Sequence, residues 1–246
     1  MESIGTSASA HSIELAWGGK LPSMGDFVWS SGRTSLRVRL DNWLMAGMQQ
    51  LRSTLSDSWE SSFDQAPMWN FIMPPNMLGP GCVAGCISPS CDRIGRRFPF
   101  ATAYGLSARH LSKVMDAVPG LLSQTGFLLF HGIRRQWPRE TLATLLDRAL
   151  ANWEASVLPA AERNDSVILN VLAKEDNSPL DEDAAPAVFD RFSSLPWSNV
   201  EDSLIVGSTT SFWWTNGAGG AALKAFTYGT HLDGALMTWL FGHASV

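Results

Sequence analysis

Two short stretches, about seventy residues apart, carry the charged residues that could do chemistry in this chain. Residues 19–28 read Gly-Lys-Leu-Pro-Ser-Met-Gly-Asp-Phe-Val, and residues 92–99 read Asp-Arg-Ile-Gly-Arg-Arg-Phe-Pro. In both, charges stand among glycine, proline and aromatic residues, where they are costly to keep unless they are paired or used. The candidate site residues are Lys20, Pro22, Gly25, Asp26, Phe27, Asp92, Arg93, Arg96, Arg97, Phe98 and Pro99.

The residue types predict that both stretches are shaped loops. Pro22 fixes one backbone angle and Gly25 permits a positive φ, so the first loop has a specified conformation that aims its charges in definite directions. In the second, Asp92 can start a turn by accepting hydrogen bonds from the backbone amides that follow it. The arginines then come immediately before an apolar, strand-like segment.

Two interpretations of these charges are open. In the structural one, Asp26 and Asp92 pair with arginines such as Arg93 and Arg97 and lock the loops together, as a buried Arg–carboxylate pair would. In the functional one, Lys20 and the three arginines form a site for an anion or an acidic partner. Three arginines within five residues can clamp a phosphate, and one carboxylate cannot neutralise them all.

The loops need a scaffold, and the apolar periodicity predicts one. We expect strands at residues 13–17, 67–73, 82–87, 98–106, 203–207, 211–215 and 221–228, and helices at 35–55, 111–122, 141–158, 184–192 and 232–241. Strands and helices are interleaved, and a glycine-rich turn at 216–220 predicts one of several hairpins. This pattern indicates an α/β fold with a mixed β-sheet covered by helices on both faces, a layered α/β sandwich.

The length of 246 residues fits one elaborated domain, or a domain with a subdomain. We expect residues 1–12 to be disordered and residues 13–246 to form a single α/β domain. Within it, residues 110–200 are a candidate helical lobe. Residues 175–183 contain five carboxylates and predict a solvated loop.

Composition excludes several classes of protein. The chain is 45% hydrophobic and 17% charged, so it can fill a sizeable core. The net charge is −5, and no basic run accompanies an aromatic platform, so we expect no nucleic-acid partner. There is no signal-peptide pattern and no membrane-length apolar stretch, and the three cysteines are an odd number. We therefore expect a cytoplasmic protein with reduced thiols and no membrane insertion.

No motif in the sequence establishes catalysis. Cys82, Cys86 and Cys91 have no nearby histidine to complete a zinc site. The Gly-x-Gly-x-x-Ala pattern of residues 79–84 is followed by a predicted strand, whereas a dinucleotide site needs a helix there. No metalloprotease motif or serine nucleophile elbow occurs. We expect no catalytic residue, no cofactor and no metal.

A second candidate surface is the pair Trp213-Trp214. Adjacent residues on a strand face opposite sides of the sheet, so one of the two can enter the core. The other lies under a helix or is exposed, and an exposed tryptophan would be a binding hot spot.

The two charged stretches, in this order, resemble the signature of the TagF/ImpM family, which is associated with bacterial type VI secretion. Residues 211–214, Ser-Phe-Trp-Trp, resemble a Ser-x-Trp-Trp element near a late strand of that family. The chain differs at Met24, where the family pattern has arginine, and at Cys91, where it has an aliphatic residue. The resemblance covers roughly residues 13–106 and 205–240.

The resemblance implies a non-enzymatic accessory protein of a type VI secretion system. Family members act after translation to repress assembly or firing, and their partners are secretion components. The partner implied here is the forkhead-associated scaffold on which a threonine kinase and phosphatase act. Two alternatives stay open: an unrecognised enzyme or binder of a phosphorylated or anionic ligand through Lys20, Asp26 and residues 93–97, and a purely structural subunit. The sequence leaves the oligomeric state unassigned.

Overall fold

The computed structural model describes residues 13–107, 111, 114–158, 200, 203–229 and 231–242. The expectations for residues 1–12, for the acidic segment 175–183 and for a helix at 184–192 lie outside these residues.

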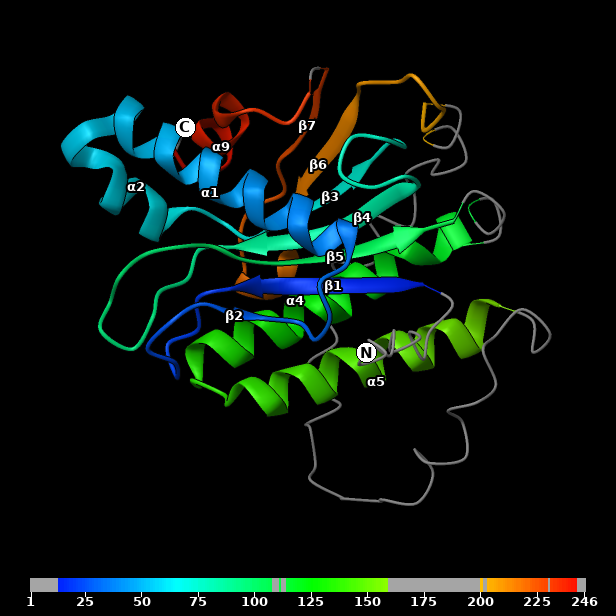
Figure 1. Ribbon diagram of the computed structural model, residues 1–246, viewed down its shortest axis with the longest axis horizontal. Coiled ribbons are helices and arrows are strands. Elements are labelled where there is room, and N and C mark those ends of the chain that lie inside the picture. Colours follow the sequence, from blue (N-terminus) through cyan, green and yellow to red (C-terminus); the bar gives the residue numbers. More distant parts are fainter. Residues whose placement is uncertain are drawn as a thin grey trace, which may run out of the picture.

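Seven strands in the described part form one sheet, in the order β2-β1-β5-β4-β3-β6-β7 (Figure 1). The strands are β1 (Glu14–Gly19), β2 (Val28–Trp29), β3 (Trp69–Met73), β4 (Cys82–Ser88), β5 (Phe100–Leu106), β6 (Ser211–Thr215) and β7 (Ala225–Tyr228). The predicted hairpin between the last two is confirmed, with Ser211 opposite Tyr228.

The sheet differs from the prediction in one respect: we expected it to be mixed, but every strand pair in the described part is antiparallel. The reason lies in the connections. β3, β4 and β5 follow one another through short loops, as do β6 and β7, and a short loop can only return the chain antiparallel. The α-helices of the described part that connect strands lie between β2 and β3 and between β5 and β6, which are not neighbours in the sheet, so none of them forms a crossover between adjacent parallel strands, and the last helix follows β7.

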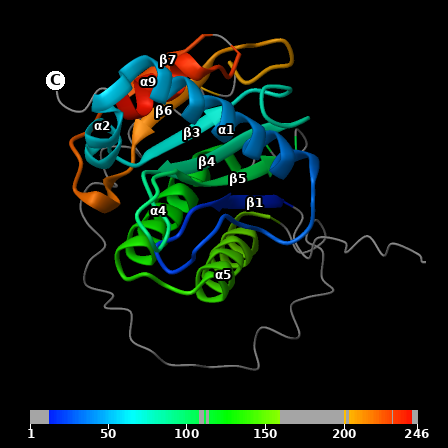
Figure 2. The same cartoon turned by 60° about the vertical axis from the view of Figure 1, so that its left-hand side comes forward.

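Helices cover both faces, as predicted, and the α/β class is confirmed. On one face lie α1 (Ser35–Leu55), α2 (Trp59–Gln65) and α9 (Gly234–Gly242), and on the other α4 (Val118–Arg134) and α5 (Arg139–Val157) (Figures 1 and 2). Short 3-10 helices are η1 (Ser56–Ser58), η2 (Met115–Ala117) and η6 (Gly217–Gly219). Each face has its own buried apolar cluster, so the sheet separates two cores.

The described part of residues 110–200 belongs to one of these cores. Leu122 and Leu129 of α4 and Leu146 of α5 lie in the same buried cluster as Tyr104 and Phe100 of β5. The helices α4 and α5 therefore pack into the core on their side of the sheet. Residues 159–199 lie outside the described part.

One predicted helix extends further than expected, and one predicted strand is wrong. The described residues of 111–122 are helical, through η2 and the start of α4, but α4 continues to Arg134, through Gly126, where a methyl group would lie 2.0 Å from Nδ2 of Asn216. This glycine marks a close approach inside the helix and not its end. The strand expected at 203–207 is a series of turns in which Gly207 has φ +93°.

Candidate functional site: a charged junction between two loops

The first loop, residues 20–27, is held by its own turn and by a distant connection. The backbone NH of Met24 donates to the carbonyl of Leu21 at 2.9 Å, closing a turn with Pro22 at its second position. Leu21 is buried in the core, and the Ser23 hydroxyl donates to the carbonyl of Trp137 at 2.8 Å, between α4 and α5. The loop is therefore fixed in shape, as predicted.

The second loop, residues 89–99, turns around Asp92. The NH of Gly95, which has φ +84°, donates to the Asp92 carbonyl at 2.9 Å. The carboxylate Oδ1 of Asp92 accepts the backbone NH groups of Ile94 at 3.1 Å and of Arg96 at 2.9 Å. The role of Asp92 as a turn starter is confirmed.

The two loops meet at the same aspartate. Oδ2 of Asp92, whose side chain is 0% exposed, lies 3.0 Å from Nζ of Lys20 and 2.6 Å from Nε of Arg96. The Lys20 side chain is 8% exposed. Arg96 also donates through Nη2 to the carbonyl of Gly25 at 2.7 Å, and the Arg93 NH donates to the carbonyl of Met24 at 2.8 Å. A buried charge with hydrogen bonds to both loops thus joins them.

The environment of Asp92 stabilises its ionised form. Burial works to raise the pKa of this carboxyl group, but the hydrogen bonds from Lys20 and from the backbone and side chain of Arg96 outweigh it. The pKa of Asp92 is therefore lowered well below its ordinary value. Asp92 is a carboxylate that accepts hydrogen bonds and holds the loops.

Asp26 does not take the part predicted for it. Its side chain is exposed, its Oδ1 accepts the NH of Phe27 at 2.8 Å, and it forms no ion pair with any residue the structure describes. The next residue, Phe27, makes the contacts between the loops instead, although its side chain is partly exposed. The Phe27 ring packs edge-on against Phe98 at 4.8 Å and lies 5.1 Å from Nζ of Lys20. The predicted pairing of Asp26 with Arg93 or Arg97 is wrong.

Arg97 pairs with a helix that the sequence did not predict. Its Nε and Nη2 each lie 2.8 Å from a carboxylate oxygen of Asp64, and its Nη1 lies 2.9 Å from Oε2 of Glu60. Both carboxylates belong to α2. Their spacing of four residues places them on one helical face, which was a usable signal, but it does not say which arginine they meet.

The other members of the two stretches divide between surface and core. The side chain of Arg93 is exposed and has no ion pair among the described residues, and that of Arg96 is 56% exposed. Phe98 and Pro99 are buried. A methyl group on Gly19, which has φ +132°, would lie 2.0 Å from the Pro99 carbonyl oxygen, so only glycine fits where the two stretches touch.

Trp213 and Trp214 do not form a partner surface. They face opposite sides of the sheet, as predicted, but both are buried, Trp213 in one core and Trp214 in the other. The reason is that helices cover both faces at this strand. Trp213 packs against Trp43 of α1, with ring centroids 6.0 Å apart. The candidate partner surface at these residues is therefore wrong.

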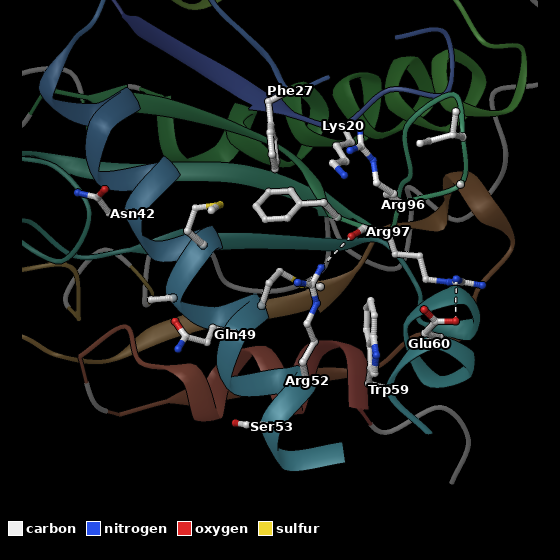
Figure 3. Close-up of a pocket in the computed structure, with 16 residues that line it drawn as sticks. Lys20, Phe27, Asn42, Gln49, Arg52, Ser53, Trp59, Glu60, Arg96 and Arg97 are labelled. Carbon is white, nitrogen blue, oxygen red and sulfur yellow. Dashed lines mark hydrogen bonds and ion pairs between the residues drawn. The ribbon is translucent and has the colours of Figure 1, made fainter. Parts of the chain in front are cut away.

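A groove of about 1270 Å³ opens beside the junction (Figure 3). One wall is α1, and the other is formed by residues 94–98 with Lys20 and Phe27. Trp59 and Glu60 close one end of the lining. The guanidinium of Arg52 lies 4.8 Å from the Trp59 ring centroid and donates to the Arg97 carbonyl at 3.4 Å.

In the described part of the chain, no group of three His, Cys, Asp or Glu side chains is placed to hold a metal ion. None of the helices within the described ranges has the length and apolar character needed to cross a membrane.

Residues 16–149, more than half of the chain, match the model of the TagF N-terminal domain, which is type VI secretion system-associated. The chain therefore belongs to the TagF family. The crystal structure of PA0076 from Pseudomonas aeruginosa PAO1 is similar to it, with a TM-score of 0.61 and 24% identity over 95% of this chain and 96% of that one. That likeness bears on the fold alone. No curated protein matches the chain.

Proposed function

We propose that this protein is a cytoplasmic, non-enzymatic accessory regulator of a bacterial type VI secretion system. It acts after translation, by binding, and represses assembly or firing. Membership of a type VI secretion-associated family supports the choice of system. The observation that carries the binding role is the groove beside the charged junction, which is lined by arginines and by exposed apolar side chains.

The partner in this proposal is the forkhead-associated scaffold. In the pathway of this family, a threonine kinase and a phosphatase act on that scaffold, so a protein that sequesters it controls the machine after its components are made. A rigid three-layer fold with preformed loops suits this role, because a preorganised surface loses little conformational entropy on binding.

The test is a pull-down with the tagged full-length chain from a lysate that contains the secretion cluster, analysed by quantitative mass spectrometry. We expect the scaffold to be enriched about tenfold or more over a tag-only control, as for a specific complex. Bait that retains its circular dichroism spectrum and its cooperative unfolding, yet recovers no cluster component, would refute the proposal.

A second candidate is a binder of a phosphorylated ligand, favoured by the Arg96 side chain, which is 56% exposed, and by the exposed Arg93. Its enzymatic version is less well supported, because Asp26, the base it needs, lies exposed against the NH of Phe27. Phosphate and phosphothreonine titrations that raise the unfolding temperature at millimolar concentration, and lose this effect in Arg96→Gln, would favour this candidate.

A further inference from the structure

We propose that the groove between α1 and residues 94–98 is the surface that docks the partner, and that the partner inserts an acidic segment carrying a large apolar side chain. The identity of the partner rests on the proposed function, but the chemistry of the segment rests on the groove itself.

The groove has the shape of a chain-binding site. α1 contributes Asn42, Met45, Gln49 and Arg52, which follow one face of the helix over more than two turns. The volume of about 1270 Å³ exceeds the roughly 300–1,000 Å³ usual for small-molecule pockets. A segment of polypeptide fits such a groove better than a metabolite does.

The lining is positive in a protein whose net charge is −5. It contains one carboxylate, that of Glu60, and four cations, which are Lys20, Arg52, Arg96 and Arg97. Asp92 and Asp64 lie outside the lining and pair with three of these cations, so the four cations and three carboxylates together still carry one net positive charge. Opposite charge across an interface guides the partner and fixes its register. The same argument disfavours nucleic acid, because its uniform phosphate charge would also meet Glu60 and, behind it, Asp64.

The donors that stay available favour carboxylates over a single phosphate. Lys20 is engaged by Asp92, and three nitrogens of Arg97 are engaged by Asp64 and Glu60. Arg96 binds through Nε and Nη2, and Arg52 through Nη2 alone. Within the described residues each keeps at least one nitrogen without a hydrogen bond. Two separate guanidinium groups with spare donors match carboxylates spaced along a segment.

Apolar side chains complete the surface. Of the seven large apolar side chains that are exposed in the described part, three line this groove: Ile94 at 71%, Met45 at 50% and Phe27 at 38% exposure. Apolar groups gathered in a groove with charged neighbours mark a binding site, whereas apolar residues scattered singly over a surface do not. They would take the large apolar side chain of the partner, flanked by its carboxylates.

The direct test uses an array of 15-residue peptides that covers every protein of the secretion cluster, with single-stranded DNA spots alongside. The full-length chain is applied at low and at high salt. We expect it to bind peptides that contain an aromatic or large aliphatic residue flanked by Asp or Glu, more weakly at high salt because exposed charges are screened.

Two groove variants and two matched controls sharpen the test. Ile94→Asp and Arg52→Glu change exposed groove residues, while Val206→Asp and Arg148→Glu put the same charges at exposed positions outside the groove lining, in place of an aliphatic residue and an arginine. We expect each groove variant to weaken peptide binding about tenfold or more, and each control to stay within about twofold. Unchanged thermal unfolding of all four variants excludes misfolding as the cause.

The same variants in the pull-down separate this inference from the proposed function. If the groove variants recover the scaffold as well as wild type does, the proposed docking surface is wrong, while the proposed regulatory function is supported. If wild type recovers no cluster component, but acidic peptides bind it and the groove variants weaken that binding, the proposed regulatory function is wrong and the proposed docking surface is supported. An array with no bound peptide, with basic peptides bound, or with DNA as the preferred spot overturns the groove.

Discussion

Replacing Asp92 with asparagine tests the junction on which the site is built. The substitution keeps the shape of the side chain and removes the negative charge that Lys20 and Arg96 share. The Lys20 ammonium, on a side chain only 8% exposed, then has no carboxylate at 3.0 Å. The contact between Lys20 of the first loop and residue 92 of the second loop is therefore weakened.

The magnitude follows from what each group can do afterwards. Breaking a buried ion pair by removing one partner costs about 3–5 kcal/mol, because the other charge stays buried. Arg96 is 56% exposed and can turn to water, and the amide oxygen of asparagine still accepts backbone NH groups as Oδ1 of Asp92 does. We therefore expect Asp92→Asn to lower the free energy of unfolding by about 3 kcal/mol, at the low end of that range.

Equilibrium urea unfolding, followed by tryptophan fluorescence, measures this loss. Asp26→Asn is the matched control: it removes an exposed aspartate from the same pair of loops, and we expect a change within about 0.5 kcal/mol. Adding Lys20→Met to Asp92→Asn removes the stranded ammonium. The loss in free energy of unfolding of the double variant should therefore be smaller, by at least about 1 kcal/mol, than the losses of the two single variants added together.

Two results would refute this reasoning. If Asp92→Asn stays within about 1 kcal/mol of wild type, the buried charge does not hold the loops. If Asp26→Asn costs as much as Asp92→Asn, the exposed aspartate carries the role that the structure gives to the buried one.

Three further outcomes are expected. Because the folded-state pKa of Asp92 lies below the unfolded value of about 3.9, its charge stabilises the fold above that pH and the contribution is lost as pH falls toward the folded pKa. Urea titrations should thus show wild type losing more stability than Asp92→Asn between about pH 6 and pH 3, and parallel curves would contradict this. Arg97→Lys keeps a charge beside Asp64 but loses the two-point contact; because these groups are partly exposed, the urea midpoint should report a loss of only about 0.5–1 kcal/mol, and a loss above about 2 kcal/mol would count against it. Gly126→Ala should cost about 1–3 kcal/mol in thermal unfolding, because its methyl group would meet the buried amide of Asn216, and an unchanged midpoint would show that the helix can shift away.

Local signals predicted much of the scaffold. α1 begins at Ser35 after Thr34, whose hydroxyl accepts the NH of Arg37 at 3.2 Å, and it ends at Leu55, where the apolar period stops. The hairpin of β6 and β7 turns in the glycine-rich segment that predicted it. In these cases the helix cap, the apolar periodicity and the turn residues are all local features, so they can be recognised within one short stretch of sequence.

The wrong predictions concern side chains whose burial or pairing depends on contacts with segments far away in the sequence. Asp26 and Asp92 are the same residue type in similar surroundings of glycine and aromatic residues, and only the folded loops show which carboxylate is enclosed. The pairing of Arg97 with α2 depends on a short helix that lies far from the arginine in sequence. Trp213 and Trp214 were assigned to opposite faces correctly, but their burial depends on helices from other parts of the chain.

The charged junction and the groove are formed by the same strands and loops. Antiparallel pairing places Gly19, at the end of β1, opposite Phe100, at the start of β5, so the strands themselves deliver Lys20 and residues 89–99 to the same place. The ion pair then determines the conformation of loops that the sheet has already brought together. Since the turn at Asp92 carries Ile94 and Arg96 into the groove wall, the charge that stabilises the fold also preorganises the surface proposed to meet the partner. A surface fixed in this way would lose little conformational entropy on binding.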